Sequence, residues 1–314
     1  MAKYVVTGGA GFIGSHMVEA LLGRGHTVRV VDSLVTGSRA NMASFVDRIE
    51  FIEGDLAEIA VARRAVDGME FVLHQAAIPS VPRSVAEPER CHRANVDGTL
   101  NVLLASRDAG IRRLVFAGSS SVYGNSATLP KREDMPPKPL SPYALHKLVG
   151  EQYAQLFTSL YGLETVTTRY FNVFGPRQDP SSPYSGVISL FIRALVDGRA
   201  ATIYGDGEQT RDFTYVANVV DGVLKACDAP GAAGKIFNVA TGGRISLNHL
   251  YRALQELTGR QIAATYAPTR VGDVRDSQAD ITAAREVLGF TPTVTFEDGL
   301  AKTLAWFRQD AGRA

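Results

Sequence analysis

The side chains best suited to proton transfer in this chain are Tyr143 and Lys147, four residues apart. Residues at this spacing lie on one face of a helix, so the phenol and the ammonium would be neighbours. A nearby positive charge favours the phenolate, which allows a tyrosine to act as a base near neutral pH. Ordinary surface pairs share this spacing, so the chemistry depends on what else the chain places beside them.

Ser119 is a third candidate because it follows a predicted strand at residues 113–117. In parallel sheets, ligands collect at the carboxyl ends of the strands. A serine hydroxyl at that edge can hydrogen-bond the reacting oxygen alongside Tyr143. Ser119, Ser120 and Ser121 form a triplet, and any of them could instead stabilise a turn.

A glycine-rich loop near the start of the chain is suited to binding phosphates. Gly8, Gly11 and Gly14 stand at three-residue spacing between a predicted strand and a predicted helix. Glycine allows the tight turn, the close approach of backbone to pyrophosphate, and the packing of helix against strand. The first N–H groups of the helix then point at the phosphates. This arrangement predicts a dinucleotide-binding loop.

Acidic residues follow the next two predicted strands. Asp32 comes directly after residues 27–31, where its carboxylate can accept hydrogen bonds from the adenosine ribose. A 2′-phosphate at that place would meet a negative charge, so NAD is favoured over NADP. Asp55 follows the third strand, within Gly54-Asp55-Leu56, and we expect it near the adenine.

These groups need a scaffold that brings distant segments to one edge. Short apolar runs alternate with segments of helical spacing, which is typical of a parallel sheet with helices on both faces. The predicted strands are residues 3–7, 27–31, 49–53, 71–74, 113–117 and 164–169, and the predicted helices are 17–22, 57–66, 93–109 and 143–160. We therefore predict an α/β fold with a doubly wound parallel sheet (Rossmann).

The second half is less regular and predicts a smaller mixed α/β C-terminal region that binds substrate. Its predicted strands are 202–204 and 236–240, its helices 188–196, 216–227, 247–257, 281–288 and 296–307, and the loops 130–142 and 174–184 precede it. The expected division is 1–172 for the NAD-binding domain, with 212–242 packing back onto it. Residues 173–211 and 243–314 are expected to form the second domain, which would bind the substrate.

Composition excludes several classes of partner. The 314 residues carry a formal net charge of +1, which provides no electrostatic footprint for nucleic acid or a membrane surface. Neither a signal peptide nor a membrane-spanning apolar run is visible, so a cytoplasmic location is expected. The two cysteines, Cys91 and Cys227, stand outside any metal-ligand spacing and are expected to be reduced, with no metal site.

A set of motifs runs nearly end to end: residues 7–14, 119–124, 143–147, 169–175, 205–207, 211–213 and 270–275. Together they resemble the extended short-chain dehydrogenase/reductase superfamily, and within it the nucleotide-sugar 4-epimerases of the UDP-glucose and UDP-N-acetylglucosamine type. Relatives usually dimerise through two helices of each subunit, here about 93–109 and 143–160. The resemblance therefore implies NAD, a UDP-sugar substrate and a homodimer.

The resemblance also implies roles for individual residues. The catalytic residues are Ser119, Tyr143 and Lys147. The residues expected to bind NAD are Gly8, Gly11, Phe12, Ile13, Gly14, Asp32, Asp55, Leu56, Ala76, Ala77, Asn95, Tyr143, Lys147, Tyr170 and Val173. The residues expected to bind the nucleotide sugar are Ser119, Tyr143, Asn172, Arg211, Arg270, Asp273 and Ser277, where the two arginines would hold the diphosphate with their donor forks.

In such enzymes Tyr143 would remove the proton of the sugar 4-hydroxyl while C4 gives a hydride to NAD+. Similar 4,6-dehydratases carry an acidic pair immediately before Val-Tyr-Gly, and related decarboxylases carry a glutamate there. This chain has Ser120 and Ser121, which are too weak to serve as acid or base on the keto-sugar. We therefore predict that the hydride returns on the other face of the sugar, which inverts C4.

Several alternatives remain at this level. The small Ser277 leaves room for an acetamido group, so UDP-N-acetylhexosamines are candidate substrates beside UDP-glucose and UDP-galactose. A UDP-glucuronate 4-epimerase would need a cation near C6, supplied by Arg83 or Arg177. A dehydratase and a non-catalytic NAD sensor are weaker alternatives. Gln75 replaces the apolar residue usual in relatives, which leaves open whether it contacts the cofactor.

Overall fold

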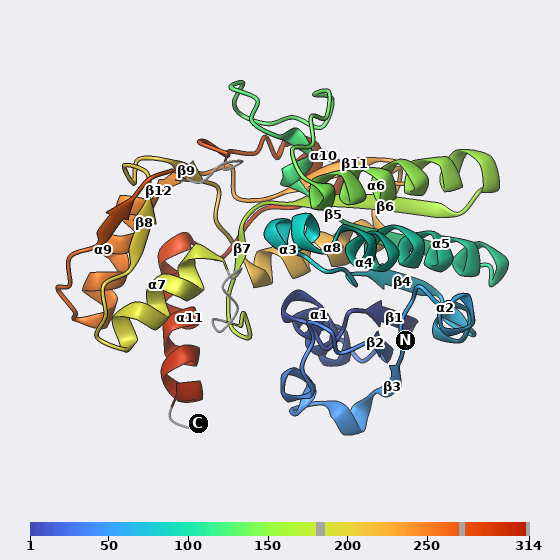
Figure 1. Ribbon diagram of the computed structural model, residues 1–314. Coiled ribbons are helices and arrows are strands. Elements are labelled where there is room, and N and C mark those ends of the chain that lie inside the picture. The colour runs from blue at the N-terminus through green and yellow to red at the C-terminus, as the bar shows by residue number, and fades with distance from the viewer. Residues whose placement is uncertain (180–185, 270–273, 312–314) are drawn as a thin grey trace.

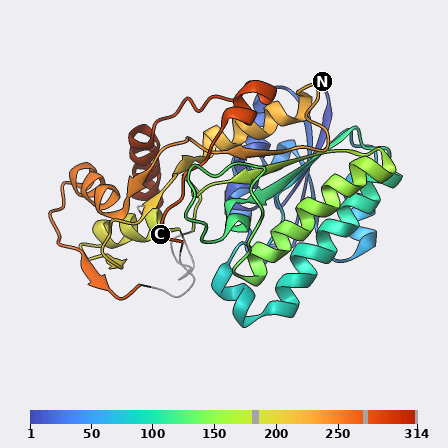
Figure 2. The same ribbon diagram turned by 90° about the horizontal axis from the view of Figure 1, so that it is seen from above.

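The computed structural model describes residues 1–179, 186–269 and 274–311, and Figures 1 and 2 show it from two directions. In this part of the chain, seven parallel strands form one sheet in the order β11-β6-β5-β4-β1-β2-β3. Their bounds are β1 Lys3–Thr7, β2 Thr27–Asp32, β3 Glu50–Glu53, β4 Phe71–His74, β5 Arg113–Ser119, β6 Glu164–Tyr170 and β11 Ile236–Val239. The order reverses direction beside β1, which confirms the predicted doubly wound α/β sheet.

Both faces of this sheet are buried under helices. Neighbouring residues of a strand point to opposite faces, and accordingly Val5 and Val6 of β1 belong to two different hydrophobic clusters. One face is covered by α1 Phe12–Gly23 and α8 Val216–Asp228, the other by α2 Ile59–Val66, α5 Gly98–Asp108 and α6 Pro142–Tyr161. Helices α5 and α6 run side by side in Figure 2.

A second, smaller region lies beyond the carboxyl ends of the strands, on the left of Figure 1. Helices α7 Val187–Val196, α9 Leu247–Thr258 and α11 Phe296–Ala311 pack together there. Beside them, strand β8 Thr202–Tyr204 pairs with β13 Thr265–Ala267. The rings of Phe191 and Tyr251 meet edge to face at 5.4 Å and join α7 to α9.

Two further short strand pairs lie outside the seven-stranded sheet. Strand β7 Val173–Phe174 pairs in parallel with β10 Thr214–Tyr215, and β9 Thr210–Arg211 pairs antiparallel with β12 Ile245–Ser246. The remaining elements are η1 Arg39–Met42, η2 Val46–Arg48, α3 Val81–Ala86, α4 Pro88–His92, η3 Arg93–Asp97, η4 Ser120–Tyr123 and α10 Thr282–Leu288. Among the described residues, no helix is both long enough and apolar enough to cross a membrane.

The structure differs from the sequence prediction before α5. A single helix was expected over residues 93–109, but the helical path opens with the π-helical turn η3 and becomes regular at Gly98. Two short helices, α3 and α4, precede it and were not predicted. Each helix carries a proline in its first turn, where the missing N–H of proline costs no hydrogen bond within the helix.

Candidate active site

The glycine loop forms a backbone cradle between β1 and α1. Gly8 adopts a positive φ of 69°, and a Cβ there would lie 2.8 Å from the Cα of Ala76. A Cβ on Gly14 would lie 2.2 Å from the carbonyl oxygen of Gly8, so the helix packs directly on the turn. The Gly11 N–H donates to the Gly8 carbonyl oxygen at 3.0 Å, which closes the loop.

The first turn of α1 is electrostatically suited to an anion. In the described structure no side chain caps its N-terminus at Gly11, and its first turn holds no acidic residue. The N–H groups that begin a helix lack partners within the helix, and they carry its positive dipole end. The cradle and the helix start, where Phe12 and Ile13 lie, therefore fit the pyrophosphate of a dinucleotide.

Asp32 lies at the carboxyl end of β2 and is buried. Its carboxylate accepts the Ala10 N–H at 3.0 Å and the Leu34 N–H at 2.8 Å. Burial raises the pKa of this carboxyl and the two backbone donors oppose the rise. Asp32 thus fixes the glycine loop to β2, and each carboxylate oxygen keeps acceptor capacity for a ribose hydroxyl.

Asp55 and Leu56 follow β3 close to Asp32, since the Gly54 N–H donates to the Asp32 carbonyl oxygen at 3.1 Å. Asp55 is exposed and accepts the Ala57 N–H at 2.9 Å, whereas Leu56 is buried. This places an acidic side chain beside the end of β2, at the edge where an adenosine would lie.

The predicted catalytic residues converge at the ends of β5 and α6. Helix α6 starts sharply because Ser141 caps the Ala144 N–H at 3.2 Å and Pro142 occupies its first position. Tyr143 is therefore in the first turn, with Lys147 one turn later. Ser119 ends β5, where its Oγ lies 2.9 Å from the Oγ of Ser121, and it is close enough to Tyr143 to influence the pKa of that phenol.

The electrostatics of this cluster are dominated by burial. Lys147 is buried, donates from Nζ to the Ala117 carbonyl oxygen at 2.9 Å, and lies over the Phe116 ring. Burial lowers the pKa of Lys147 to about 8. Burial also raises the pKa of Tyr143, and the Ser119 hydroxyl opposes this rise. The spacing predicts that Lys147 favours the phenolate, whereas burial, the largest influence on the pKa of Tyr143, favours the neutral phenol.

Two further candidates occupy the same sheet edge. Tyr170 ends β6, and its hydroxyl donates to Gln75 Oε1 at 2.9 Å across the intervening strand β5. Ala76 backs the glycine loop through its contact with Gly8. Ala77 and Val173, the first residue of β7, are half-buried close to these strand ends.

Asn95 differs from the other candidates because its side chain is not open to a ligand. It is buried in the η3 turn, where its side chain accepts the Ile78 N–H at 2.7 Å and donates to the Ile78 carbonyl oxygen at 3.3 Å. Both ends of the amide are thus engaged with one backbone residue. This geometry fits a structural role that fixes the segment following β4.

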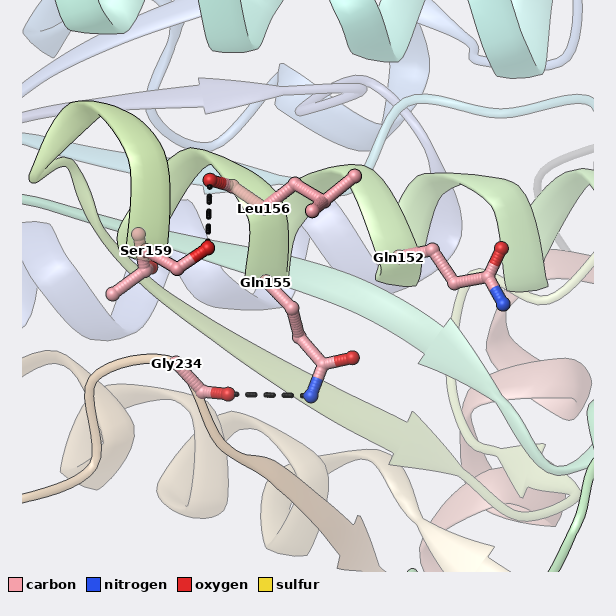
Figure 3. Close-up of a pocket in the computed structure, with 6 residues that line it drawn as sticks. Gln152, Gln155, Leu156, Ser159 and Gly234 are labelled. Atoms are coloured by element: carbon pink, nitrogen blue, oxygen red, sulfur yellow. Dashed lines mark hydrogen bonds between the residues drawn. The ribbon is translucent and has the colours of Figure 1, made fainter.

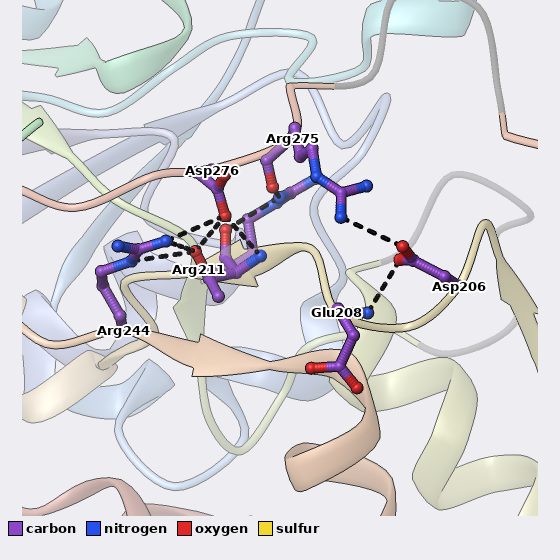
Figure 4. A network of polar contacts seen from close by, with 7 residues as sticks. Asp206, Glu208, Arg211, Arg244, Arg275 and Asp276 are labelled. Atoms are coloured by element: carbon purple, nitrogen blue, oxygen red, sulfur yellow. Dashed lines mark hydrogen bonds and ion pairs between the residues drawn. The ribbon is translucent and has the colours of Figure 1, made fainter. Parts of the chain in front are cut away.

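On the substrate side, Arg211 lies in a network of polar contacts (Figure 4). Its Nη1 donates to the carbonyl oxygens of Thr210 and Arg275, each at 2.9 Å. Asp276 Oδ1 accepts the Thr210 hydroxyl at 2.5 Å and Arg244 Nη2 at 3.1 Å. Two arginines from separate segments therefore converge on β9, a donor-rich arrangement suited to a diphosphate.

Asp212 is the functional neighbour that the sequence analysis left without a role, although it lies within one of the motifs. It is fully buried and accepts four hydrogen bonds: the Thr241 N–H and hydroxyl, the Gly242 N–H and the Ala279 N–H. Asn172, at a positive φ of 34°, donates to the Asp212 carbonyl oxygen at 3.2 Å. Asp212 thus anchors three segments that border the site.

The remaining substrate candidates divide into two groups. Ser277 is buried, and its N–H donates to the Thr210 carbonyl oxygen at 3.1 Å, which ties it to the Arg211 strand. Arg270 and Asp273 lie outside the described residues, as does the last part, 180–184, of the loop expected over 174–184.

A cavity of about 590 Å³ lies elsewhere, along the outer side of α6 (Figure 3). It is lined by Gln152, Gln155, Leu156, Thr158, Ser159 and Gly234. These residues belong to the C-terminal half of α6 and the turn before β11, whereas Tyr143 lies in the first turn of the helix. Among the described residues, no group of acidic, histidine or cysteine side chains is arranged to hold a metal ion.

A parallel sheet with a glycine cradle at one strand end and a Ser-Tyr-Lys cluster at the neighbouring ends defines a dinucleotide-dependent enzyme of the dehydrogenase/reductase class. The profile of the NAD dependent epimerase/dehydratase family matches residues 4–240, and this chain belongs to that family.

Individual proteins match along nearly the whole chain. The UDP-glucose 4-epimerase of Mycolicibacterium smegmatis is 41% identical over 310 residues, covering 98% of both chains. The structure of UDP-glucose 4-epimerase from Thermotoga maritima with UDP-glucose has 38% identity and a TM-score of 0.94, covering 98% of this chain and 99% of that one.

A second structure has the same identity, coverage and TM-score: UDP-N-acetylglucosamine 4-epimerase from Methanobrevibacter ruminantium in complex with UDP-N-acetylmuramic acid. These matches confirm the resemblance to nucleotide-sugar epimerases and the prediction of NAD as cofactor. The two structures contain different nucleotide sugars, so the likeness to them does not select one sugar for this chain.

Proposed function

We propose that this protein interconverts the C4 epimers of a UDP-hexose and keeps NAD bound through the turnover. The observation that carries this proposal is the meeting of Ser119 at the end of β5 with Tyr143 and the buried Lys147 of α6, at the sheet edge that holds the glycine cradle. Proton transfer and dinucleotide binding are thus placed together.

NAD, when bound, supplies the acceptor and later the donor of a hydride at C4 of the sugar. The chain's own groups manage the proton. Tyr143 takes the proton of the 4-hydroxyl and returns it, while Ser119 hydrogen-bonds the same oxygen. Lys147 uses one of its three N–H donors on Ala117, so two remain to stabilise negative charge nearby.

The carboxylates around this cluster are engaged elsewhere, which favours epimerisation over elimination. Glu151 forms a buried two-point ion pair with Arg169, whose guanidinium lies 4.6 Å from the centre of the Tyr123 ring. Glu133 accepts the Asn238 N–H at 2.7 Å. Ser120 and Ser121 occupy the positions where dehydratases carry their acids, so a 4-keto-sugar would meet no general acid from that segment.

Two half-buried arginines bear on the choice of sugar. A UDP-glucuronate substrate would need Arg83 or Arg177 near C6, but Arg83 pairs with Glu87 at 3.2 Å and Arg177 with Glu19 at 2.7 Å. Both cations thus have a carboxylate partner, although Arg177 Nη1 is buried without a hydrogen-bond partner among the described residues. A neutral UDP-hexose is therefore preferred, and the small side chain of Ser277 supports acceptance of the N-acetylated sugar as well.

We assign the binding of NAD and of the nucleotide sugar to different parts of the chain. Residues 1–172 with 212–242 would hold NAD, and residues 173–211 with 243–314 would hold the nucleotide sugar. On the substrate side, Arg211 and Asn172 would contact the phosphates, with Arg270 also on the diphosphate and Asp273 on the uridine ribose. Arg244 is added to the diphosphate site because it donates to the Thr210 hydroxyl and to Asp276, while Arg211 donates to the Thr210 carbonyl oxygen.

The test is to incubate the protein separately with UDP-glucose, UDP-N-acetylglucosamine and UDP-glucuronate and to follow the products by NMR. We expect the galacto isomer of the first or second sugar, without accumulation of NADH. A 4-keto-6-deoxy product would show a dehydratase. Turnover of UDP-glucuronate alone would show the uronate enzyme, and no turnover of any sugar would favour an NAD sensor.

We also propose a homodimer through α5 and α6. Leu145, Leu156, Leu160 and Tyr161 are exposed on α6. Exposed apolar side chains concentrated on one helix are typical of an interface. Light scattering after size-exclusion chromatography should give twice the chain mass, and Leu156→Asp with Leu160→Asp should give the monomer mass; a monomeric wild-type protein would contradict the proposal.

A further inference from the structure

Gln75 is a half-buried residue whose side-chain amide has incomplete hydrogen bonding. It follows β4 directly, and its Oε1 accepts the Tyr170 hydroxyl at 2.9 Å. Its Nε2 is buried without a hydrogen-bond partner within the described residues. The motif resemblance leads one to expect an apolar residue here, so this chain maintains a polar group where packing alone does not require one.

An unpaired buried donor is costly. Leaving an amide N–H without a partner forfeits its hydration and destabilises the protein by about 1–3 kcal/mol. Natural proteins leave few such groups, and those that persist have a reason such as a ligand. The Tyr170 hydroxyl fixes the carbonyl end of the amide, so the Nε2 end is held in a defined orientation.

The surroundings of Gln75 indicate which ligand would accept a hydrogen bond from its Nε2. On one side is the glycine cradle, because a Cβ on Gly8 would lie 3.0 Å from the Gln75 carbonyl carbon. On the other side is the proton-transfer cluster, because Tyr170 of β6 pairs in register with Ser119 of β5.

Strand β5 runs between β4 and β6, and its Ala117 carbonyl holds Lys147. Gln75 and Tyr170 therefore meet over the strand end where Lys147 is anchored. The dinucleotide must pass between the cradle, which takes its pyrophosphate, and Tyr143, next to which hydride transfer occurs. The segment that crosses Gln75 is then the nicotinamide riboside.

We propose that Gln75 Nε2 donates a hydrogen bond to an oxygen of the nicotinamide riboside half of NAD, and that Tyr170 orients the amide for this contact. The inference rests on the proposed function only in requiring that NAD binds this edge. Gln75 is thus a cofactor-positioning residue, and the acceptor is a ribose hydroxyl or the carboxamide oxygen.

The test compares nucleotide affinities of Gln75→Met, Tyr170→Phe and the double variant, by calorimetric titration of the nucleotide-free full-length chain. Methionine matches the length of glutamine and has no donor. Gln75→Leu is a second variant should methionine pack poorly. Gln309→Met, at an exposed position on α11, is the matched control. Each protein is titrated with NAD, ADP-ribose and ADP.

We expect Gln75→Met to weaken NAD binding about three- to tenfold, with ADP affinity unchanged. Tyr170→Phe should weaken NAD binding less, and the double variant should resemble Gln75→Met because the two residues act as one unit. Weakened ADP-ribose binding would assign the ribose as acceptor, and unchanged ADP-ribose binding would assign the carboxamide.

Three results would overturn the inference. One is unchanged NAD affinity in Gln75→Met or Gln75→Leu. Another is equal weakening of ADP and NAD. The third is a lower melting temperature of the nucleotide-free protein with an unaltered NAD-induced shift, which would show a purely structural amide. If the wild-type chain itself bound no NAD, the proposed function would fail instead, so the two failures are distinguishable.

Discussion

Two ion pairs of similar length show how differently the two regions of the molecule are built. Arg169 and Glu151, beside the proton-transfer cluster, meet at 2.6 Å with side chains only 2% and 3% exposed. Arg275 and Asp206, in the C-terminal region, meet at 3.0 Å with side chains 59% and 54% exposed. The first pair is isolated from water and doubly bonded, whereas the second competes with solvent at every moment.

The difference suggests that the two regions rely on different kinds of interaction. The NAD side relies on buried, mutually satisfied groups and on backbone geometry, which hold reacting atoms in place. On the substrate side, exposed arginines contact carbonyl oxygens and partly exposed carboxylates, as in Figure 4, and such contacts can be exchanged for a diphosphate at little cost. The following predictions test this contrast, beginning with the largest effect.

Tyr143→Phe removes the proposed base without changing the helix that carries it. Turnover measured by NMR should fall about 10²- to 10⁴-fold, because general acid–base catalysis contributes that much. NAD affinity should remain, since the glycine cradle is intact. Tyr153→Phe, further along the same helix, should keep full activity. Surviving activity in Tyr143→Phe would show that another group moves the proton.

Glu151→Ala leaves the Arg169 guanidinium buried and uncompensated. Breaking one partner of a buried pair destabilises a protein by about 3–5 kcal/mol, which urea unfolding would measure as a lower midpoint. The double variant Glu151→Leu/Arg169→Met should recover much of this loss because no charge is left behind. A loss below about 1 kcal/mol in Glu151→Ala would contradict the isolation of this pair from water.

Lys147 should give stability and activity opposite dependences on pH. Its folded pKa of about 8 lies below its ordinary value of 10.5, so above pH 8 the folded chain releases a proton that the unfolded chain still holds. Stability relative to Lys147→Met should then rise with pH between about 8 and 10.5, by roughly 3 kcal/mol at most.

Activity should fall over the same range, since neutral Lys147 no longer stabilises negative charge near Tyr143. Unfolding midpoints and NMR rates across this pH range would check both trends. Parallel pH profiles for the wild-type protein and Lys147→Met would show that the lysine titrates outside this window.

Gly14→Ala and Gly23→Ala compare two glycines of the same helix. A Cβ on Gly14 would lie 2.2 Å from the backbone oxygen of Gly8, whereas a Cβ on Gly23 meets nothing within 4 Å. Gly14→Ala should lower stability by about 1–3 kcal/mol and weaken NAD binding, because the cradle must open. Gly23→Ala should be neutral or slightly stabilising. Equal effects of the two substitutions on stability and NAD binding would mean that the cradle is not rigid.

Arg275→Gln should have the smallest effect. Exposed ion pairs contribute about 0–1 kcal/mol, so chemical unfolding should be nearly unchanged and NAD affinity equal to wild type. A stability loss above about 2 kcal/mol would remove the distinction between the two regions. Asp206→Asn is the matched change on the other partner and should behave alike.

The large parallel sheet could be predicted because its strands are continuous apolar runs separated by helical periodicity. Residues 3–7 and 71–74 match β1 and β4, while β2, β5 and β6 extend beyond the expected ends by one or two residues. Strands β7, β9, β10 and β12 span two residues each. So short a segment has no periodicity, and its pairing depends on partners more than thirty residues away.

The candidate site was partly visible for the same reason. Tyr143, Lys147 and the glycines have a spacing that expresses their geometry, and Ser119 lies at a strand end. The contacts of Asp212 with Thr241 and Ala279 could not be read from the sequence, because they join loops whose approach depends on the whole fold. The unpaired amide of Gln75 is likewise invisible until burial is known.

The edge strand β11 has a consequence for how the protein is made. It pairs with β6, although the chain leaves the sheet after Tyr170 and returns only at Ile236. During synthesis, the sheet remains one strand short while the intervening residues 171–235, which include α7 and α8, are made. The edge of β6 therefore stays unpaired until the ribosome has passed residue 239, and a truncated nascent chain would be prone to pair that edge with a neighbour.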